Sequence, residues 1–146
     1  MIALLLALLA DPPAPPQPAS IDGLPIGALA AQSLPARGCA AYLFSTGATR
    51  TLAAMATADP GSIRLVLDGA VADYPRVGQS GTANLGFAPV SEYRLGDVTV
   101  RLEMAVSRRA DLADGALISS AMLRIDRGAK DGIIMPLGGL IGCAKK

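Results

Sequence analysis

The segment Asp97–Ser107, with the sequence DVTVRLEMAVS, alternates apolar and polar side chains along its length. The apolar positions of this segment are Val98, Val100, Leu102, Met104 and Val106. The polar positions are Asp97, Thr99, Arg101, Glu103 and Ser107. Successive side chains of a β-strand point to opposite faces, so this pattern predicts a long strand with one buried face and one face in water.

Two further segments show the same alternation. In Ser62–Asp68, apolar residues occupy every second position from Ile63, which predicts a second amphipathic strand. Ala116–Asp126 predicts a third. The expected buried face of this third strand consists of Leu117, Ala121, Leu123 and Ile125.

Shorter apolar runs surround these strands and end at turn residues. Cys39–Ser45 predicts a first strand, and Ile133–Cys143, which contains one proline and three glycines, predicts a bent closing strand. The alanines of Arg50–Ala58 fit a helix, but its position between turns favours a strand. The spacing predicts an all-β fold, a small antiparallel β-sandwich or flattened barrel of about seven strands.

Residues 70–90 form the longest stretch without a clean period and are rich in glycine, proline and polar residues. Long irregular segments in compact domains often carry function. We therefore predict that a functional loop, if the protein has one, lies here.

Cys39 and Cys143, the two cysteines of the chain, lie near the two ends of the predicted strand region. In an oxidising compartment they would form a disulfide that encloses most of the domain. The alternative is a pair of free, buried cysteines that act as small apolar residues. A zinc site is disfavoured, because two thiolates without histidine do not complete one.

The N-terminus begins with an apolar run, IALLLALLA, at residues 2–10. Nine residues are too few to cross a bilayer but fit the apolar region of a secretory signal peptide. We expect a leader at 1–10, with a cleavage site up to residue 19, and a periplasmic or secreted product without a stable membrane span. The alternative is a buried apolar helix, against which the prolines that follow argue.

The predicted leader is followed by a segment rich in proline, alanine and glycine at residues 11–36. We interpret it as a linker, with one or two helical turns near Gly27–Ser33. The predicted β domain then spans residues 37–146.

Composition excludes several classes of function. The chain has 13 Lys and Arg residues against 12 Asp and Glu residues. It therefore lacks the excess of basic residues that binding to nucleic acid would require. The chain has no histidine, which removes the commonest general base and the commonest metal ligand. We expect no cofactor, no metal site and no catalytic constellation.

Asp-Gly pairs recur at positions 22, 68, 114 and 131, and turn chemistry accounts for each of them.

The leading hypothesis is an exported, non-catalytic binding or structural module whose partner is an envelope protein or a small ligand. One alternative is a hydrolase based on two converging carboxylates. Its candidate acids are Asp68, Asp73, Asp111 and Asp114. Another alternative is a carrier that holds a small apolar ligand inside the barrel.

Overall fold

The structure is a computed structural model that describes residues 18–47, 50–109 and 115–144. The predicted leader at 1–10 and residues 11–17 of the predicted linker lie outside the described residues. Asp111 and Asp114 lie outside them as well.

The described secondary structure consists of β-strands, so the all-β prediction is confirmed. The strands are β1 (Ile26–Gly27), β2 (Cys39–Ser45), β3 (Leu52–Ala58), β4 (Gly61–Leu67), β5 (Ala70–Ser80), β6 (Val90–Leu95), β7 (Val98–Ser107), β8 (Gly115–Arg127) and β9 (Lys130–Cys143). Within the described ranges, no helix has the length and apolar character needed to cross a membrane.

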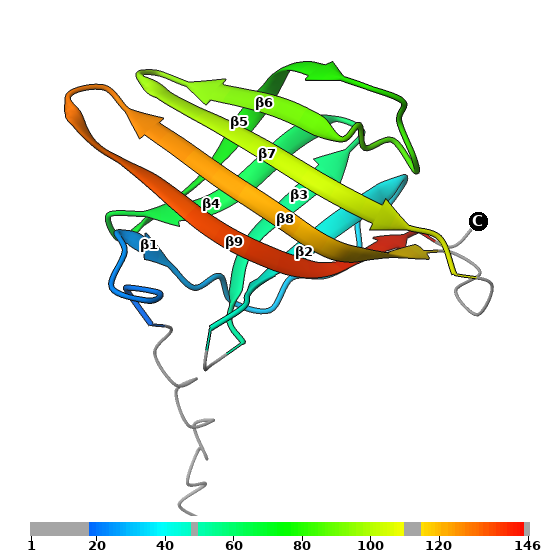
Figure 1. Cartoon of the computed structure of the whole chain (residues 1–146), viewed down its shortest axis with the longest axis horizontal. Helices are drawn as coiled ribbons and strands as arrows, with labels where there is room; N and C mark the ends of the chain where they lie inside the picture. The colour runs from blue at the N-terminus through cyan, green and yellow to red at the C-terminus, as the bar shows by residue number, and fades with distance from the viewer. Residues whose placement is uncertain (1–17, 48–49, 110–114, 145–146) are drawn as a thin grey trace, which may run out of the picture.

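The strands from β2 to β9 form a closed antiparallel barrel of eight strands, one more than the number expected, with β1 added beside β4 (Figure 1). Each of these strands pairs with the next along the chain, and β9 returns to pair with β2. Because all consecutive pairs are hairpins, the ladder between β2 and β9 closes the ring.

A disulfide joins the two strands of this closing ladder. Cys39 and Cys143 lie directly opposite each other in the register, with their Cα atoms 4.0 Å apart. The predicted disulfide is therefore confirmed, and it connects the start of the first barrel strand to the end of the last.

The barrel interior is filled by the apolar faces that the sequence pattern predicted. On β7, Val100 and Leu102 are fully buried, while Arg101 and Glu103, which alternate with them, are exposed. Leu123 and Ile125 on the neighbouring β8, and Ile63 and Leu65 on β4, each have 0% exposure. A core of aliphatic side chains, rather than open space, thus occupies the middle of the barrel.

The prediction of an irregular segment over residues 70–90 is wrong for its first half. Residues 70–80 form β5, whose side chains are mostly exposed and lack a clear alternation. The strand is defined instead by its ladders to β4 and β6, which no local pattern reveals. Residues 81–89 connect β5 to β6 and place Phe87, with 1% exposure, in the core.

The predicted apolar face of Ala116–Asp126 holds for three of its four residues. Ala121, Leu123 and Ile125 are buried, but Leu117 is 38% exposed. The register between β8 and β9 shifts between Ile118 and Ala121, so the strand contains an irregularity that breaks the strict alternation. Leu117 is thereby turned to the outside.

Part of the predicted linker packs against the barrel. Ile21 and Ile26 are buried, and Leu29 contacts a small cluster with Met55 and Val66. No helical turn forms over residues 27–33: Gly27 belongs to β1 and the following residues have no regular structure. The amide of Leu29 instead donates a 2.8 Å hydrogen bond to the carbonyl of Leu52 at the start of β3, so a contact with the barrel backbone takes the place of a helical hydrogen bond.

An ion cluster joins two turns that are distant in the sequence. Asp68, in the turn after β4, accepts a 3.0 Å hydrogen bond from Arg127 and a 3.3 Å hydrogen bond from Lys130. Arg127 and Lys130 flank the turn between β8 and β9. This contact links the two hairpins β4–β5 and β8–β9 at one end of the barrel.

Gly139 allows β9 to approach β2, and its replacement tests the closing ladder. A Cβ at this position would collide with the carbonyl oxygen of Tyr42. We expect Gly139→Ala to lower the free energy of unfolding by at least about 2 kcal/mol in urea denaturation. Gly78→Ala is the matched control, because a Cβ there meets no atom within 4 Å, and it should change stability by less than about 0.5 kcal/mol. Equal effects of the two substitutions would contradict this account.

The disulfide should contribute to stability through the long loop that it closes. Its cysteines are 104 residues apart. The chain-entropy model assigns about 4.7 kcal/mol to a loop of about 100 residues, and measured effects of disulfides are commonly about 2–4 kcal/mol. We expect the Cys39→Ala/Cys143→Ala variant to lose at least about 2 kcal/mol of unfolding free energy relative to the oxidised protein. Coincident urea transitions of the two proteins would refute this expectation.

Candidate functional site

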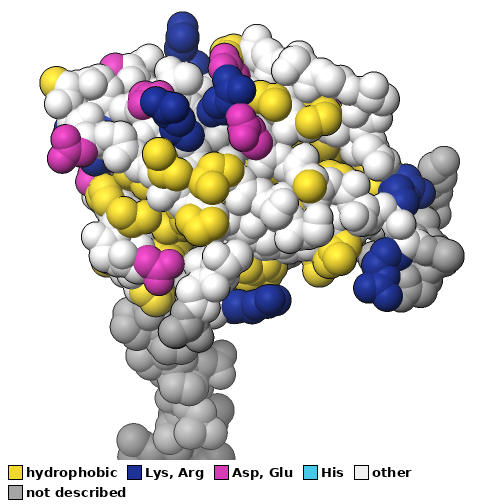
Figure 2. Space-filling view, viewed as in Figure 1, with side chains coloured by type: hydrophobic (Ala, Val, Ile, Leu, Met, Phe, Trp, Pro, Cys, Tyr) yellow, Lys and Arg dark blue, Asp and Glu magenta, His cyan; other side chains and the backbone are white. Residues whose placement is uncertain are grey.

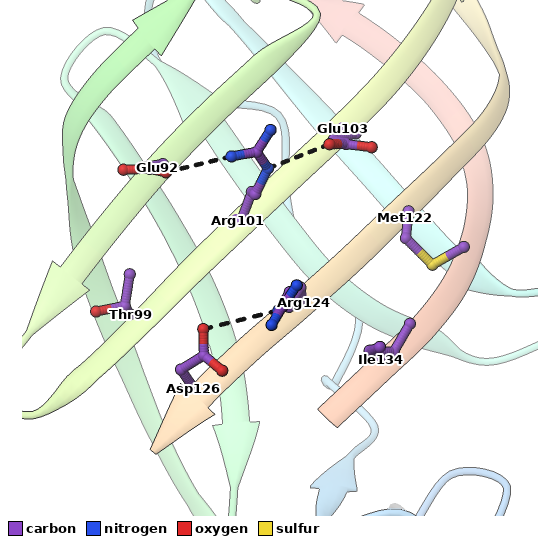
Figure 3. A pocket seen from close by; sticks show the side chains of 8 residues that line it. All are labelled: Glu92, Thr99, Arg101, Glu103, Met122, Arg124, Asp126 and Ile134. Atoms are coloured by element: carbon purple, nitrogen blue, oxygen red, sulfur yellow. Dashed lines mark hydrogen bonds and ion pairs between the residues drawn. The ribbon is translucent and has the colours of Figure 1, made fainter. Parts of the chain in front are cut away.

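The outer face of β6, β7, β8 and β9 carries a hollow of about 450 Å³ (Figure 3). Its lining comes from alternate residues of each strand, because the other residues of those strands point into the barrel. The lining residues are Glu92, Thr99, Arg101, Glu103, Met122, Arg124, Asp126 and Ile134. We refer to this set as the β6–β9 face.

The sheet register aligns the charged residues of this face across the strands. Glu92 is opposite Arg101, and Arg101 is opposite Arg124. Arg124 is in turn opposite Ile134. One row across four strands therefore reads carboxylate, guanidinium, guanidinium and isoleucine.

Ion pairs connect the charges within the face. Arg101 Nη1 lies 3.6 Å from Glu92 Oε1, and Arg101 Nε lies 3.1 Å from Glu103 Oε1. Arg124 Nε lies 3.8 Å from Asp126 Oδ2 (Figure 3). Exposed pairs of this kind contribute about 0–1 kcal/mol each, and like charges directly opposite in a ladder are unfavourable. The pattern of charges is therefore poorly explained by fold stability alone.

Apolar side chains lie beside these charges and are exposed. Met122 and Ile134, which line the hollow, are 40% and 60% exposed. Leu117 and Leu140 extend the exposed apolar surface along the same two strands, β8 and β9. Figure 2 shows hydrophobic side chains gathered next to the charged group on this side of the molecule. Contiguous exposed apolar surface beside a polar rim is typical of an interaction site.

A second hollow of about 400 Å³ lies further along β8 and β9 and reaches β2. Gly138 and Gly139 line it without side chains, and Phe44, Leu117 and Leu140 supply its apolar walls. Leu117 and Leu140 are opposite each other in the ladder. The exposed apolar surface therefore continues from the β6–β9 face toward the closing ladder.

Asp68 and Asp73, the two described carboxylates among those proposed for a hydrolase, are engaged in ion pairs. Hydrogen bonds from Lys130 and Arg127, with their positive charges, hold the pKa of Asp68 below its ordinary value. Asp73 accepts hydrogen bonds of 2.7 Å and 3.0 Å from Arg64, which lower the pKa of Asp73. A general acid needs a raised pKa, so neither described carboxyl has the electrostatics of that role.

The described interior offers little to a carrier function. Its aliphatic side chains have exposures at or near zero, which a void of ligand size would not allow. Polar groups also face inward near one end. Burial there raises the pKa of Tyr93, and the neighbouring side chains of Ser91 and Arg76 reduce this rise. Among the described residues, no hydrogen-bond partner is present for the Tyr93 and Ser91 hydroxyls or for Arg76 Nη1.

Metal ligands do not gather in the described ranges: no group of three or more His, Cys, Asp or Glu residues there could hold an ion. Both cysteines are oxidised in the disulfide.

The β6–β9 face could be predicted only in part from the sequence. Alternation marked Arg101 and Glu103 as solvent-facing, but the lateral alignment with Glu92, Arg124 and Ile134 depends on register.

No family model, no curated protein and no solved structure matches the chain.

The ion pair between Arg64 and Asp73 generates a pH prediction. Because the pKa of Asp73 is lowered in the folded state, the pair contributes stability above the unfolded pKa of about 3.9, and this contribution is lost as the pH falls through the lower folded value. We expect Arg64→Gln to shift the Asp73 carboxyl titration, followed by ¹³C NMR, to higher pH. Arg124→Gln is the control and should leave it unchanged. An unchanged Asp73 titration in Arg64→Gln would count against this assignment.

Proposed function

We propose that the chain is a small exported, non-catalytic binding module of the cell envelope, and that the β6–β9 face is its docking surface. One observation carries the proposal: the interior is filled, while this face exposes Met122 and Ile134 beside a set of paired charges. An interface commonly combines apolar anchors with polar and charged groups that select the partner.

Two features support export. The apolar run at residues 2–10 fits the core of a signal peptide. The Cys39–Cys143 disulfide is weakly consistent with an oxidising compartment, where such bonds persist. Periplasmic or secreted localisation agrees with both features.

The ion pairs of Asp68 and Asp73 support the non-catalytic part of the proposal. Each carboxylate has an arginine partner, and the pKa of each is lowered. A glycosidase-type mechanism would need one carboxyl that remains protonated near neutral pH. A binding role requires no such group.

Export is tested by intact mass spectrometry of the protein recovered from a periplasmic extract. We expect a mass that lacks the leader, and alkylation of two thiols only after reduction. The Cys39→Ser/Cys143→Ser variant, which should take up no alkylating agent, is the control for the labelling. A full-length mass with two thiols reactive before reduction would overturn the export proposal.

Docking is tested in cells by photo-crosslinking. A benzophenone side chain in place of Met122 should give a discrete adduct that Arg124→Glu abolishes, with the partner identified by mass spectrometry. The same side chain in place of Val71, which is 63% exposed on β5, is the matched control and should give no such adduct. Equal adducts from both positions, or none from Met122, would overturn the proposed docking surface.

A further inference from the structure

The β6–β9 face carries charges of both signs in nearly equal number. Arg101 and Arg124 provide two cations, and Glu92, Glu103 and Asp126 provide three carboxylates. A surface for nucleic acid or for a strongly charged protein would instead carry one dominant sign. A mixed surface is complementary to a partner with the same mixture.

The positions of these charges also suit self-association. The two arginines are neighbours in one row across the sheet. Glu103 lies on β7 two residues beyond Arg101, and Asp126 lies on β8 two residues beyond Arg124, so carboxylates flank the arginine pair on opposite sides. When two such faces pack together about a two-fold axis that runs across the strands, a displacement of one such step places Glu103 of each copy opposite Arg101 and beside Arg124 of the other, and the symmetry makes this contact twice.

Within the described residues, Arg124 is the less compensated of the two arginines. Arg101 has carboxylates at 3.1 Å and 3.6 Å, whereas the ion pair of Arg124 with Asp126 is 3.8 Å long. The side chain of Arg124 is 61% exposed, so a second carboxylate can reach it. Met122 and Ile134 lie next to it in the lining and would be covered by the same contact.

We propose that the partner of the β6–β9 face is a second copy of this chain, packed face to face around a two-fold axis. This inference rests on the proposed docking function and specifies the occupant. Apolar contact between the Met122 and Ile134 side chains of the two copies would provide the core of the interface, and the arginine and carboxylate groups would determine its register.

The test is sedimentation velocity of the oxidised chain with two charge-reversed variants. The acidic variant is Arg101→Glu/Arg124→Glu, and the basic variant is Glu92→Lys/Glu103→Lys/Asp126→Lys. We expect the wild type to form a dimer, and each variant alone to dissociate more than about 100-fold more readily, because facing like charges cost several kcal/mol. A 1:1 mixture of the variants should restore a dimer that contains one copy of each.

Two further substitutions test whether the dimer contact lies on the β6–β9 face. Val71→Glu adds a charge elsewhere on the barrel and should leave the dimer intact, whereas Met122→Glu should disrupt it. The substituted side chains are exposed, so the circular dichroism spectrum and melting temperature of each variant should stay close to those of the wild type.

A wild type that sediments as a monomer up to about 1 mM overturns the inference. So does a dimer that both charge-reversed variants retain, because the contact would then lie elsewhere. If the wild type is monomeric but Met122 crosslinks to a different protein in cells, the docking surface stands and the second copy is rejected. A monomer without any specific crosslink rejects both proposals.

Discussion

The ladder between β2 and β9 is the constraint on which the rest of the structure depends. All other neighbouring strands of the barrel are consecutive in the sequence, so their pairing closes only short loops. The β2–β9 ladder joins residues about a hundred positions apart and must overcome the entropy of that closure. Two local features favour it: Gly139 permits close approach to Tyr42, and the Cys39–Cys143 disulfide links the strand ends.

Closure determines where function can reside. Once the ring is complete, the inward side chains fill it, and Val100, Leu102 and Leu123 have no exposed surface. Chemistry that needs an internal cavity has little room in the part of the barrel that the structure describes. The same alternation that buries these residues projects Arg101 and Arg124 outward from adjacent strands. The core and the proposed docking surface are thus two consequences of one pattern.

An element could be predicted from the sequence when its own residues carry the pattern that defines it. The strands around Asp97–Ser107 and Ser62–Asp68 were predicted because one face of each is buried against the core. β5 was not, because its exposed side chains leave no period and its ladders to β4 and β6 define it. The outward turn of Leu117 depends on an irregularity in β8 that alternation cannot anticipate.

The candidate site was harder to predict than the fold for the same reason. Its solvent-facing charges on β7 could be read from the sequence, and the disulfide could be inferred because the chain has two cysteines. The row that aligns Glu92, Arg101 and Arg124 arises from register between strands. Residues 81–89 belong to the segment where a functional loop, if the protein has one, was expected, and Phe87 within them is a core residue.

The closed ring also restricts how the barrel can be recognised. Each of its eight strands pairs with two neighbours, so free backbone edge is confined to segments that extend past a neighbour, such as residues 130–136 of β9, which lie beyond the ladder with β2. Recognition by strand addition, which tolerates many sequences, is restricted to such segments. Along the paired ladders a partner must recognise side chains instead, and the selectivity of the surface can evolve by single substitutions that leave the ladder untouched.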